Sequence, residues 1–258
     1  MITSLQNPQI KNVIKLRSKK QERDRQGLMI IEGAREVERA LRAGVEMEQI
    51  YFCTDFLVGE QPPHPRAEQT SREVFEKISY REHPDGILAV GRAPTRRLSD
   101  ISLSQAPLLV VAESIEKPGN LGAILRSADA VKADGVLVCD QCTDVNNPNV
   151  IRASTGTVFT VPLAECGSEE ALQWLKKNSI QIVAASPAAQ VEYTDVDLSK
   201  PTAIVVGSEQ NGLSKKWLEQ CDLQVKIPMG GIADSLNVAT ATTILLFEAR
   251  RQRKSGHK

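Results

Sequence analysis

Three turns in this 258-residue sequence combine glycine with polar side chains, and each follows a run of apolar residues. They span residues 113–126, 207–214 and 227–237. Because ligands bind at the carboxyl ends of parallel strands, these turns are the first candidates for chemistry. The polar residues that stand out in them are Asn120, Arg126, Glu209, Ser235 and Asn237.

Each turn also has a purely structural interpretation. Asn120 stands where it could cap a helix, and Arg126 could be an ordinary surface charge. The turn at 207–214 could be a polar loop that needs glycine dihedral angles, and Asp234 or Ser235 could cap the last helix. Capping explains one of these turns but hardly all three, so their coincidence favours a ligand site.

The elements that must position these turns form a second, larger domain over residues 108–258. Six apolar runs alternate with helical stretches, which predicts a doubly wound α/β domain with about six mostly parallel strands. The predicted strands are residues 108–112, 135–139, 157–161, 180–185, 202–206 and 223–227.

A smaller α/β domain is predicted for residues 1–95, with a linker at 96–107, because residues 92–107 hold two prolines and three arginines and show little apolar periodicity. Asn7-Pro8 opens a helix whose exposed face is basic. The sequence then predicts strands at 28–33, 50–53 and 86–91 and helices at 36–43 and 71–79.

Composition limits the class of protein. The chain has 41% hydrophobic and 25% charged residues, and it contains no apolar run long enough for a membrane span and no secretory signal, which predicts a cytoplasmic globular protein. Zero net charge conceals two basic ends: residues 1–25 hold seven Lys or Arg against two acids, and residues 248–258 hold five against one. Such ends indicate local contact with a polyanion or simple solvation.

The residue patterns required for several kinds of chemistry are absent from the sequence. The five cysteines have no framework spacing, so we expect free thiols, and the Cys139 to Cys142 pair has too few possible partners for a zinc site. Neither a dinucleotide fingerprint nor a Walker-type phosphate loop is present, and there is no nucleophile elbow. We therefore predict no metal and no hydrolase chemistry.

Three motifs follow one another along the chain: NLGAILRSA (120–128), VVGSEQNGLS (205–214) and IPM…SLNVATA (227–241). In these motifs the sequence resembles the SpoU, or TrmH-type, RNA 2′-O-ribose methyltransferases of the SPOUT class, and the resemblance covers residues 108–253. The N-terminal part is similar to the L30e-like substrate-binding domain that often precedes this catalytic domain, on SLxNPxIK near the start and IIEGxREV at 30–37. One departure is Ala239 followed by Thr240, where the family more often has Ser after the Asn-Val pair.

The resemblance implies a C-terminal trefoil knot, a homodimer, and S-adenosylmethionine as cofactor. It implies catalytic roles for Asn120, Arg126, Glu209, Ser235 and Asn237. It implies a cofactor site made by Gly207, Ser208, Glu209, Ile227, Pro228, Met229, Ser235, Leu236 and Val238. In family proposals the arginine matching Arg126 is a general base, but a guanidinium is better suited to binding phosphate or a developing alkoxide.

Analogy with other L30e-like domains favours ribosomal over transfer RNA as the substrate. This RNA is expected to contact a set of basic residues. This set is Arg17, Lys19, Lys20, Arg23, Arg35 and Arg152. Two rival functions stay open: a non-catalytic RNA-binding or ribosome-assembly module on the same fold, and, more distantly, a nucleotide-dependent oxidoreductase. The intact motif residues favour the methyltransferase over the non-catalytic module.

Overall fold

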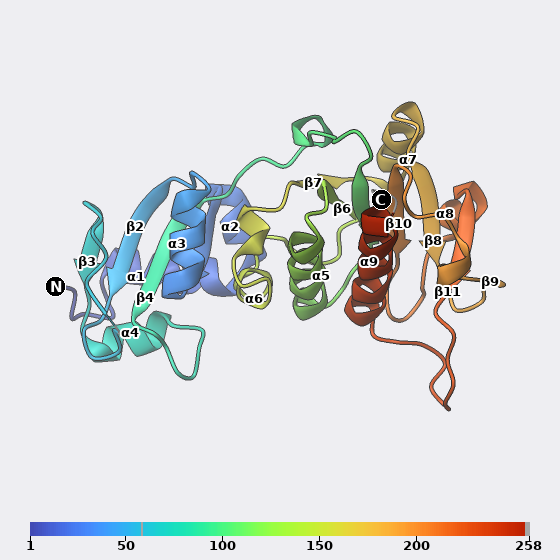
Figure 1. Ribbon diagram of the computed structural model, residues 1–258. Coiled ribbons are helices and arrows are strands. Elements are labelled where there is room, and N and C mark those ends of the chain that lie inside the picture. The colour runs from blue at the N-terminus through green and yellow to red at the C-terminus, as the bar shows by residue number, and fades with distance from the viewer. Residues whose placement is uncertain (58, 256–258) are drawn as a thin grey trace. The chain divides into compact units, whose positions relative to one another are not determined.

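The computed structural model describes residues 1–57 and 59–255, so the last three residues of the predicted second domain lie outside the described residues. Contacts divide the chain into two compact units (Figure 1). The first comprises residues 1–95 and 144–160, and the second comprises residues 96–143 and 161–258. Residues 144–160 thus fold with the first unit, although a single boundary near residue 95 had been predicted.

The first unit is built on a four-stranded sheet of order β1-β4-β2-β3. Strands β1 and β2 are both antiparallel to β4, and the short β3 is parallel to β2. The strands are β1 (Leu28–Glu32), β2 (Met47–Phe52), β3 (Ala67–Gln69) and β4 (Ile87–Arg92). The helices are α1 (Pro8–Ser18), α2 (Lys20–Gln26), α3 (Ala34–Arg42), α4 (Arg72–Ile78) and α6 (Pro148–Ala153), with a 3-10 turn η2 (Thr157–Phe159).

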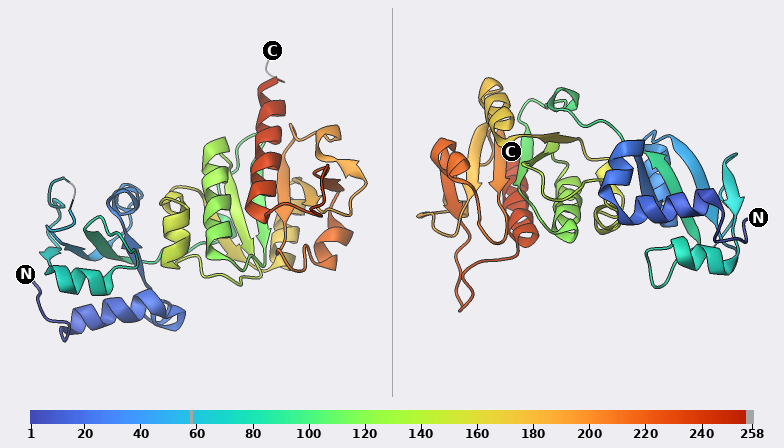
Figure 2. Two further views of the ribbon diagram at one scale, coloured as in Figure 1. Left: turned by 90° about the horizontal axis from the view of Figure 1, so that it is seen from below. Right: turned by 180° about the vertical axis from the view of Figure 1, so that it is seen from behind.

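Strand alternation gives this sheet two apolar faces. One face carries Ile30, Tyr51 and Leu88, which form a buried cluster with side chains of α1 and α4. Helix α3 lies on the opposite face (Figure 2). The predicted start of α1 is confirmed, because the Asn7 side chain accepts a hydrogen bond of 2.8 Å from the Gln9 backbone and Pro8 occupies the first turn.

The second unit has a seven-stranded sheet of order β7-β6-β5-β10-β8-β11-β9, and every neighbouring pair is parallel. The strands are β5 (Leu108–Glu113), β6 (Gly135–Cys139), β7 (Leu163–Cys166), β8 (Gln181–Ala185), β9 (Val191–Glu192), β10 (Thr202–Val206) and β11 (Leu223–Lys226). The helices are α5 (Pro118–Val131), α7 (Ser168–Lys177), α8 (Lys215–Gln220) and α9 (Val238–Ser255), with 3-10 turns η1 (Leu98–Asp100) and η3 (Tyr193–Asp195).

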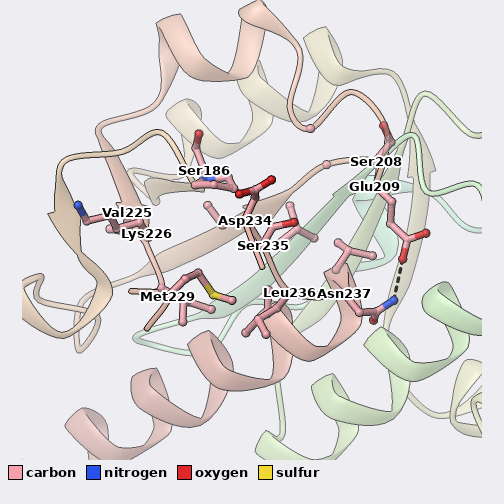
Figure 3. Close-up of a pocket in the computed structure, with 18 residues that line it drawn as sticks. Ser186, Ser208, Glu209, Val225, Lys226, Met229, Asp234, Ser235, Leu236 and Asn237 are labelled. Carbon is pink, nitrogen blue, oxygen red and sulfur yellow. Dashed lines mark hydrogen bonds between the residues drawn. The ribbon is translucent and has the colours of Figure 1, made fainter. Parts of the chain in front are cut away.

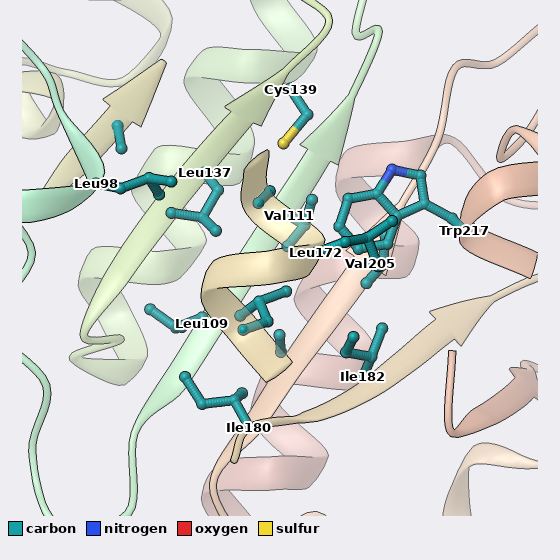
Figure 4. Close-up of a cluster of buried hydrophobic side chains, with 14 of the residues drawn as sticks. Leu98, Leu109, Val111, Leu137, Cys139, Leu172, Ile180, Ile182, Val205 and Trp217 are labelled. Atoms are coloured by element: carbon teal, nitrogen blue, oxygen red, sulfur yellow. The ribbon is translucent and has the colours of Figure 1, made fainter. Parts of the chain in front are cut away.

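Alternate residues of these parallel strands bury opposite faces of the sheet. Leu109, Val111 and Val205 pack against α7 and α8, where Trp217 is fully buried and donates its indole N–H to Ser168 Oγ at 2.8 Å (Figure 4). Helices α5 and α9 pack against each other, with α9 also against β10. The predicted parallel α/β architecture is confirmed, and the trefoil knot stays a prediction.

One predicted strand is wrong. Residues 157–161 form an apolar run of the kind found in buried strands, but Thr157–Phe159 form the 3-10 turn η2, and the edge of the sheet is taken by β7 instead. The backbone has already turned at Thr155 (φ 54°) and Gly156 (φ 83°), so the chain cannot enter an extended segment there. Backbone bonds from Phe159 N to Gly156 O and from Thr160 N to Thr157 O then close the turn.

The predicted linker also differs from expectation. Leu98 and Ile101 are buried in the core cluster of the second unit rather than exposed between the units. Arg96 is 4% exposed at its side chain and pairs with Glu165 at 3.5 Å. Within the described part of the chain, no helix is long and apolar enough to cross a membrane.

Candidate active site

A cavity of about 420 Å³ lies at the carboxyl ends of β8, β10 and β11 in the second unit (Figure 3). Eight of the nine predicted cofactor residues line it, and Pro228 is not among them in the described structure. The eight are Gly207, Ser208, Glu209, Ile227, Met229, Ser235, Leu236 and Val238. The predicted catalytic residue Asn237 also lines this cavity.

The turn after β10 owes its shape to close packing of the backbone on itself. A Cβ on Gly207 would lie 2.2 Å from the Gly212 carbonyl oxygen, so no larger residue fits there without moving the turn. Gly212 has φ of +64°, and its N–H donates to the Ser208 carbonyl oxygen at 3.0 Å. Ser208 Oγ accepts from the Asn211 N–H at 3.1 Å. This folded turn sets Glu209 at the rim of the cavity.

Three predicted catalytic residues meet in one hydrogen-bonded cluster. Glu209 Oε1 accepts from Asn120 Nδ2 at 2.8 Å and from Asn237 Nδ2 at 2.7 Å. Asn237 Nδ2 also lies 3.2 Å from Asn120 Oδ1. These residues come from three different turns, separated by up to 117 positions in the chain. We call Asn120, Glu209 and Asn237 the amide-carboxylate cluster.

Asn237 has both a structural and a site-facing role. Its Oδ1 accepts from the Ala239 and Thr240 backbone N–H groups at 3.0 and 3.4 Å and so caps α9. Its Nδ2 meanwhile donates into the cluster. Asn120 differs from expectation: α5 begins at Pro118 after Lys117, so Asn120 lies inside the first turn and its side chain serves the cluster rather than a cap.

Lys117 is a member of this site that the sequence analysis missed. Its Nζ lies 2.5 Å from Glu209 Oε2, the carboxylate oxygen that the amides leave free. The Lys117 ammonium, followed by Asn120, lowers the pKa of Glu209 below its ordinary value, and Glu209 in turn raises the pKa of Lys117. Glu209 is therefore an ionised carboxylate with three polar partners, Lys117, Asn120 and Asn237. The signal for Lys117 was its place three residues before Asn120.

The other two predicted catalytic residues lie outside the cluster. Ser235 is exposed and lines the cavity. Arg126 is exposed on α5, and its guanidinium makes no hydrogen bond or ion pair with the described residues. Six helical residues place Arg126 about 120° around α5 from the side of Asn120. Its side chain is thus left available to a group from outside the chain.

The lining of the cavity suits a ligand with both apolar and polar parts. Val206, Ile227 and Leu236 offer apolar surface, whereas Asp234, Ser235 and Glu209 offer oxygen atoms. Its volume lies within the range of small-molecule sites, about 300–1,000 Å³. Ser186 and Pro187, after β8, complete one wall and were not predicted, although they follow the predicted strand at 180–185.

The basic residues predicted to contact RNA in the first unit differ in whether their side chains also bond another group of the chain. Lys19 and Arg152 are exposed, and Arg35 keeps 56% of its side chain exposed while bonding Glu36. Lys20 is also exposed and pairs with Asp24, and Arg17 donates to the carbonyl oxygens of Lys77 and Ser79.

Arg23 is a correction to this set. Its side chain is only 4% exposed, and its Nε and Nη2 donate to Asp144 Oδ2 at 2.8 and 2.6 Å. Its Nη1 donates to the Leu16 carbonyl oxygen at 2.7 Å. A guanidinium with these partners stabilises the first unit and does not present itself to a phosphate.

The cysteines are free thiols, as predicted. Cys139 and Cys166 lie opposite each other on β6 and β7, with Sγ atoms 3.8 Å apart. The contact with Cys166 and burial raise the pKa of the Cys139 thiol. Among the described residues, no group of three or more His, Cys, Asp or Glu is placed to hold a metal ion.

The fold and the site define a class: an α/β protein that binds a small ligand at the carboxyl edge of a parallel sheet, beside an amide-carboxylate cluster. Residues 107–247 match the SpoU rRNA Methylase family, and residues 7–89 match an MRM3-like substrate binding domain. The chain belongs to the SpoU rRNA methylase family.

Named relatives extend over most of the chain. The 23S rRNA (uridine(2479)-2′-O)-methyltransferase of Streptomyces viridochromogenes is 35% identical over 237 residues, covering 88% of this chain and 77% of the relative. The 23S rRNA (guanosine(2553)-2′-O)-methyltransferase of Bacillus subtilis is 29% identical and covers 96% and 98%.

Solved structures agree over both units. A crystal structure of an RNA 2′-O ribose methyltransferase is 44% identical with a TM-score of 0.88, covering 98% of this chain and 99% of that one. The SpoU methyltransferase AviRb from Streptomyces viridochromogenes in complex with AdoMet is 29% identical with a TM-score of 0.89, covering 97% and 100%.

Proposed function

We propose that this protein transfers a methyl group from S-adenosylmethionine to a ribose 2′-hydroxyl of ribosomal RNA. The observation that carries the proposal is the amide-carboxylate cluster, which joins three family motifs at the rim of the cavity. Relatives named as 23S rRNA 2′-O-methyltransferases, and a neighbour solved with AdoMet, support both the reaction and the cofactor. The predicted cytoplasmic location fits such a substrate.

The cofactor would be held by the turns after β10 and β11, mainly by residues 207–209 and 227–229 and by 235–238. S-adenosylmethionine supplies an electrophilic methyl group on a sulfonium when bound. The residues of the chain then have to hold the 2′-hydroxyl oxygen in line with that methyl, and such positioning accounts for much of the acceleration of a displacement reaction.

Glu209 acts in this proposal as a positioning residue. Its lowered pKa and its three charged or amide partners make it a poor proton acceptor but a stable anchor for the two amides. With Glu209 fixed, Asn120 and Asn237 are held in one orientation toward the cavity rim. Ser235, exposed in the lining, offers a hydroxyl to ribose or to the methionine part of the cofactor.

Arg126 is assigned to the substrate. Its exposed guanidinium keeps its five donors free of described partners, and such a fork binds a phosphate or a developing alkoxide. A guanidinium offers donors and no acceptor, so we assign it electrostatic stabilisation rather than proton removal. Arg17, Lys19, Lys20, Arg35 and Arg152 remain in the proposed RNA-contact set, from which the burial of Arg23 removes that residue.

We also infer a homodimer formed through α5 and α9. Phe247 on α9 is 49% exposed although Leu245 and Leu246 beside it are buried. A hollow between the two helices is lined by Ala123, Ala239 and Ile244, among others. A second copy of the chain would cover this apolar surface. Light scattering after size-exclusion chromatography tests the inference, and a monomer at micromolar concentration contradicts it.

The Arg126→Ala variant tests the proposed reaction. We expect methyl incorporation from tritiated cofactor into deproteinised ribosomal RNA to fall at least about 100-fold, with cofactor binding by calorimetry retained. Lys215→Ala, which removes an exposed cation on α8, is the matched control and should keep full activity. Undiminished methylation by Arg126→Ala would contradict the residue assignment. Absence of cofactor binding by the wild-type protein would favour a non-catalytic RNA-binding module.

A further inference from the structure

Tyr80 is an exposed aromatic residue that the sequence analysis did not single out. It lies in the first unit just after α4, and its side chain is large, apolar and 45% exposed. A lone exposed aromatic residue is ordinary, so its surroundings decide whether it has a role.

The backbone around Tyr80 is fixed by a buried carboxylate. Glu32 is only 6% exposed, and its Oε2 accepts from the Tyr80 N–H at 2.7 Å. Its Oε1 accepts from Ser79 Oγ at 2.5 Å and from the Arg81 N–H at 3.3 Å. Arg81 in turn bonds the Glu32 carbonyl oxygen and the buried Glu36. The segment that carries Tyr80 is therefore rigid rather than a loose loop.

The ring of Tyr80 is also held at its far end. Asn149 Nδ2 on α6 donates to the Tyr80 hydroxyl at 2.8 Å, which ties the residue to the segment 144–160 of the same unit. A ring fixed at both ends loses little conformational entropy when a flat group packs on its exposed surface. The buried Glu32 carboxylate and helix α6 thus hold the Tyr80 ring in a position that is exposed to solvent.

Arg152 provides a cation on α6, the helix whose Asn149 holds this ring. It lies three residues after Asn149 on α6, so the two side chains share one face of the helix. Arg152 is exposed, and its guanidinium has no hydrogen-bond or ion-pair partner among the described residues. Arg17 reaches the same neighbourhood, since its Nη1 donates to the Ser79 carbonyl oxygen at 2.5 Å. Sequence segments far apart therefore meet around Tyr80.

We propose that Tyr80 is a stacking platform for an unpaired base of the substrate RNA, with Arg152 binding a neighbouring phosphate and Asn149 positioning the ring. A pre-fixed aromatic ring and an exposed guanidinium on the helix that holds it are a combination suited to single-stranded nucleic acid. Glu82, two residues further on, is exposed and negatively charged, so stacking, which does not depend on charge, supplies the larger share of the affinity. The inference rests on RNA being the substrate, as proposed above.

The test measures RNA binding without cofactor, by fluorescence anisotropy with a labelled single-stranded oligouridine. Tyr80→Ala should weaken binding about 5- to 150-fold, whereas Tyr80→Phe, which keeps the ring, should stay within about threefold of wild type. Leu41→Ala, an exposed apolar residue on α3 of the same unit, is the matched control and should bind normally. Unchanged binding by Tyr80→Ala, or an equal loss in Tyr80→Phe, would overturn the stacking role.

Two further measurements separate stacking from a structural effect. Irradiating the wild-type protein with an oligomer that carries 5-iodouridine should cross-link the base to a peptide containing Tyr80; cross-linking only elsewhere overturns the proposal. Arg152→Ala should reduce the slope of log affinity against log salt by about one. Because neither readout needs methyl transfer, Tyr80-dependent binding in a protein without methyltransferase activity would contradict the proposed reaction but not this inference.

Discussion

The Arg23–Asp144 pair of the first unit and the amide-carboxylate cluster of the second both include residues more than eighty positions apart. They differ in exposure. The side chains of Arg23 and Asp144 are 4% and 7% exposed, whereas Glu209 keeps 25% of its side chain exposed and Lys117 keeps 70%. The buried pair is satisfied by partners within the chain, and the cluster stands at the rim of a cavity. The exposure of a charged side chain thus indicates its role. A buried charge stabilises the fold, whereas an exposed charge at a cavity rim is placed to contact a ligand.

Breaking the buried pair should produce the largest effect on stability. Asp144→Ala leaves the Arg23 guanidinium buried without its carboxylate, and we expect a loss of about 3–5 kcal/mol in the free energy of unfolding. Urea denaturation followed by circular dichroism measures it. Glu38→Ala, which breaks the exposed Arg42–Glu38 pair, is the control and should change stability by no more than about 1 kcal/mol.

The double variant Arg23→Leu with Asp144→Leu sharpens this test. Replacing both charges with apolar side chains should recover most of the lost stability, since no charge is then left buried alone. If Asp144→Ala is as stable as Glu38→Ala, the pair does not hold the segment 144–160 to the first unit as the contacts indicate.

Removing the carboxylate of the cluster should have a large effect on the reaction rate and a small effect on stability. Glu209→Ala frees Asn120 and Asn237 from their shared acceptor, and we expect the rate of methyl transfer to fall about 100-fold because a misplacement of 1 Å costs about that much. Stability should change by less than about 1 kcal/mol because the residue is exposed. Single-turnover kinetics with saturating RNA measure the rate. A variant that unfolds as readily as Asp144→Ala would erase the contrast between the two regions.

The smallest effect concerns pH. The pKa of Glu209 lies below the ordinary value for a glutamate. The carboxylate is therefore ionised at any pH above that ordinary value, and it is protonated only as the pH falls through the lowered pKa. Lys117→Met removes the largest cause of the shift, and the acidic limb of the kcat/KM profile should therefore move to higher pH. Lys215→Met serves as the control. An unmoved limb would mean that Lys117 does not control the ionisation of Glu209 during turnover.

Much of the second unit was predictable from sequence because its signals are local. Five of the six predicted strands are present, and the turns after four of them contain the residues that line the cavity or form the cluster. Apolar runs of parallel strands and glycine-bearing turns are properties of short segments, so a single sequence displays them. The motifs at 120–128, 205–214 and 227–241 likewise indicated the family that the comparisons then established.

The sequence by itself determined the strands, the turns and the kinds of side chain at the site. Only the tertiary structure decided that residues 144–160 fold with the first unit, that Arg23 is buried, that Lys117 joins Glu209, and that Thr157–Phe159 form a 3-10 turn. The reason is physical: burial and pairing depend on residues as many as 121 positions away, and a local pattern contains no information about such partners. The sequence does not show which arginine is buried and which is exposed, because burial is set by the tertiary structure.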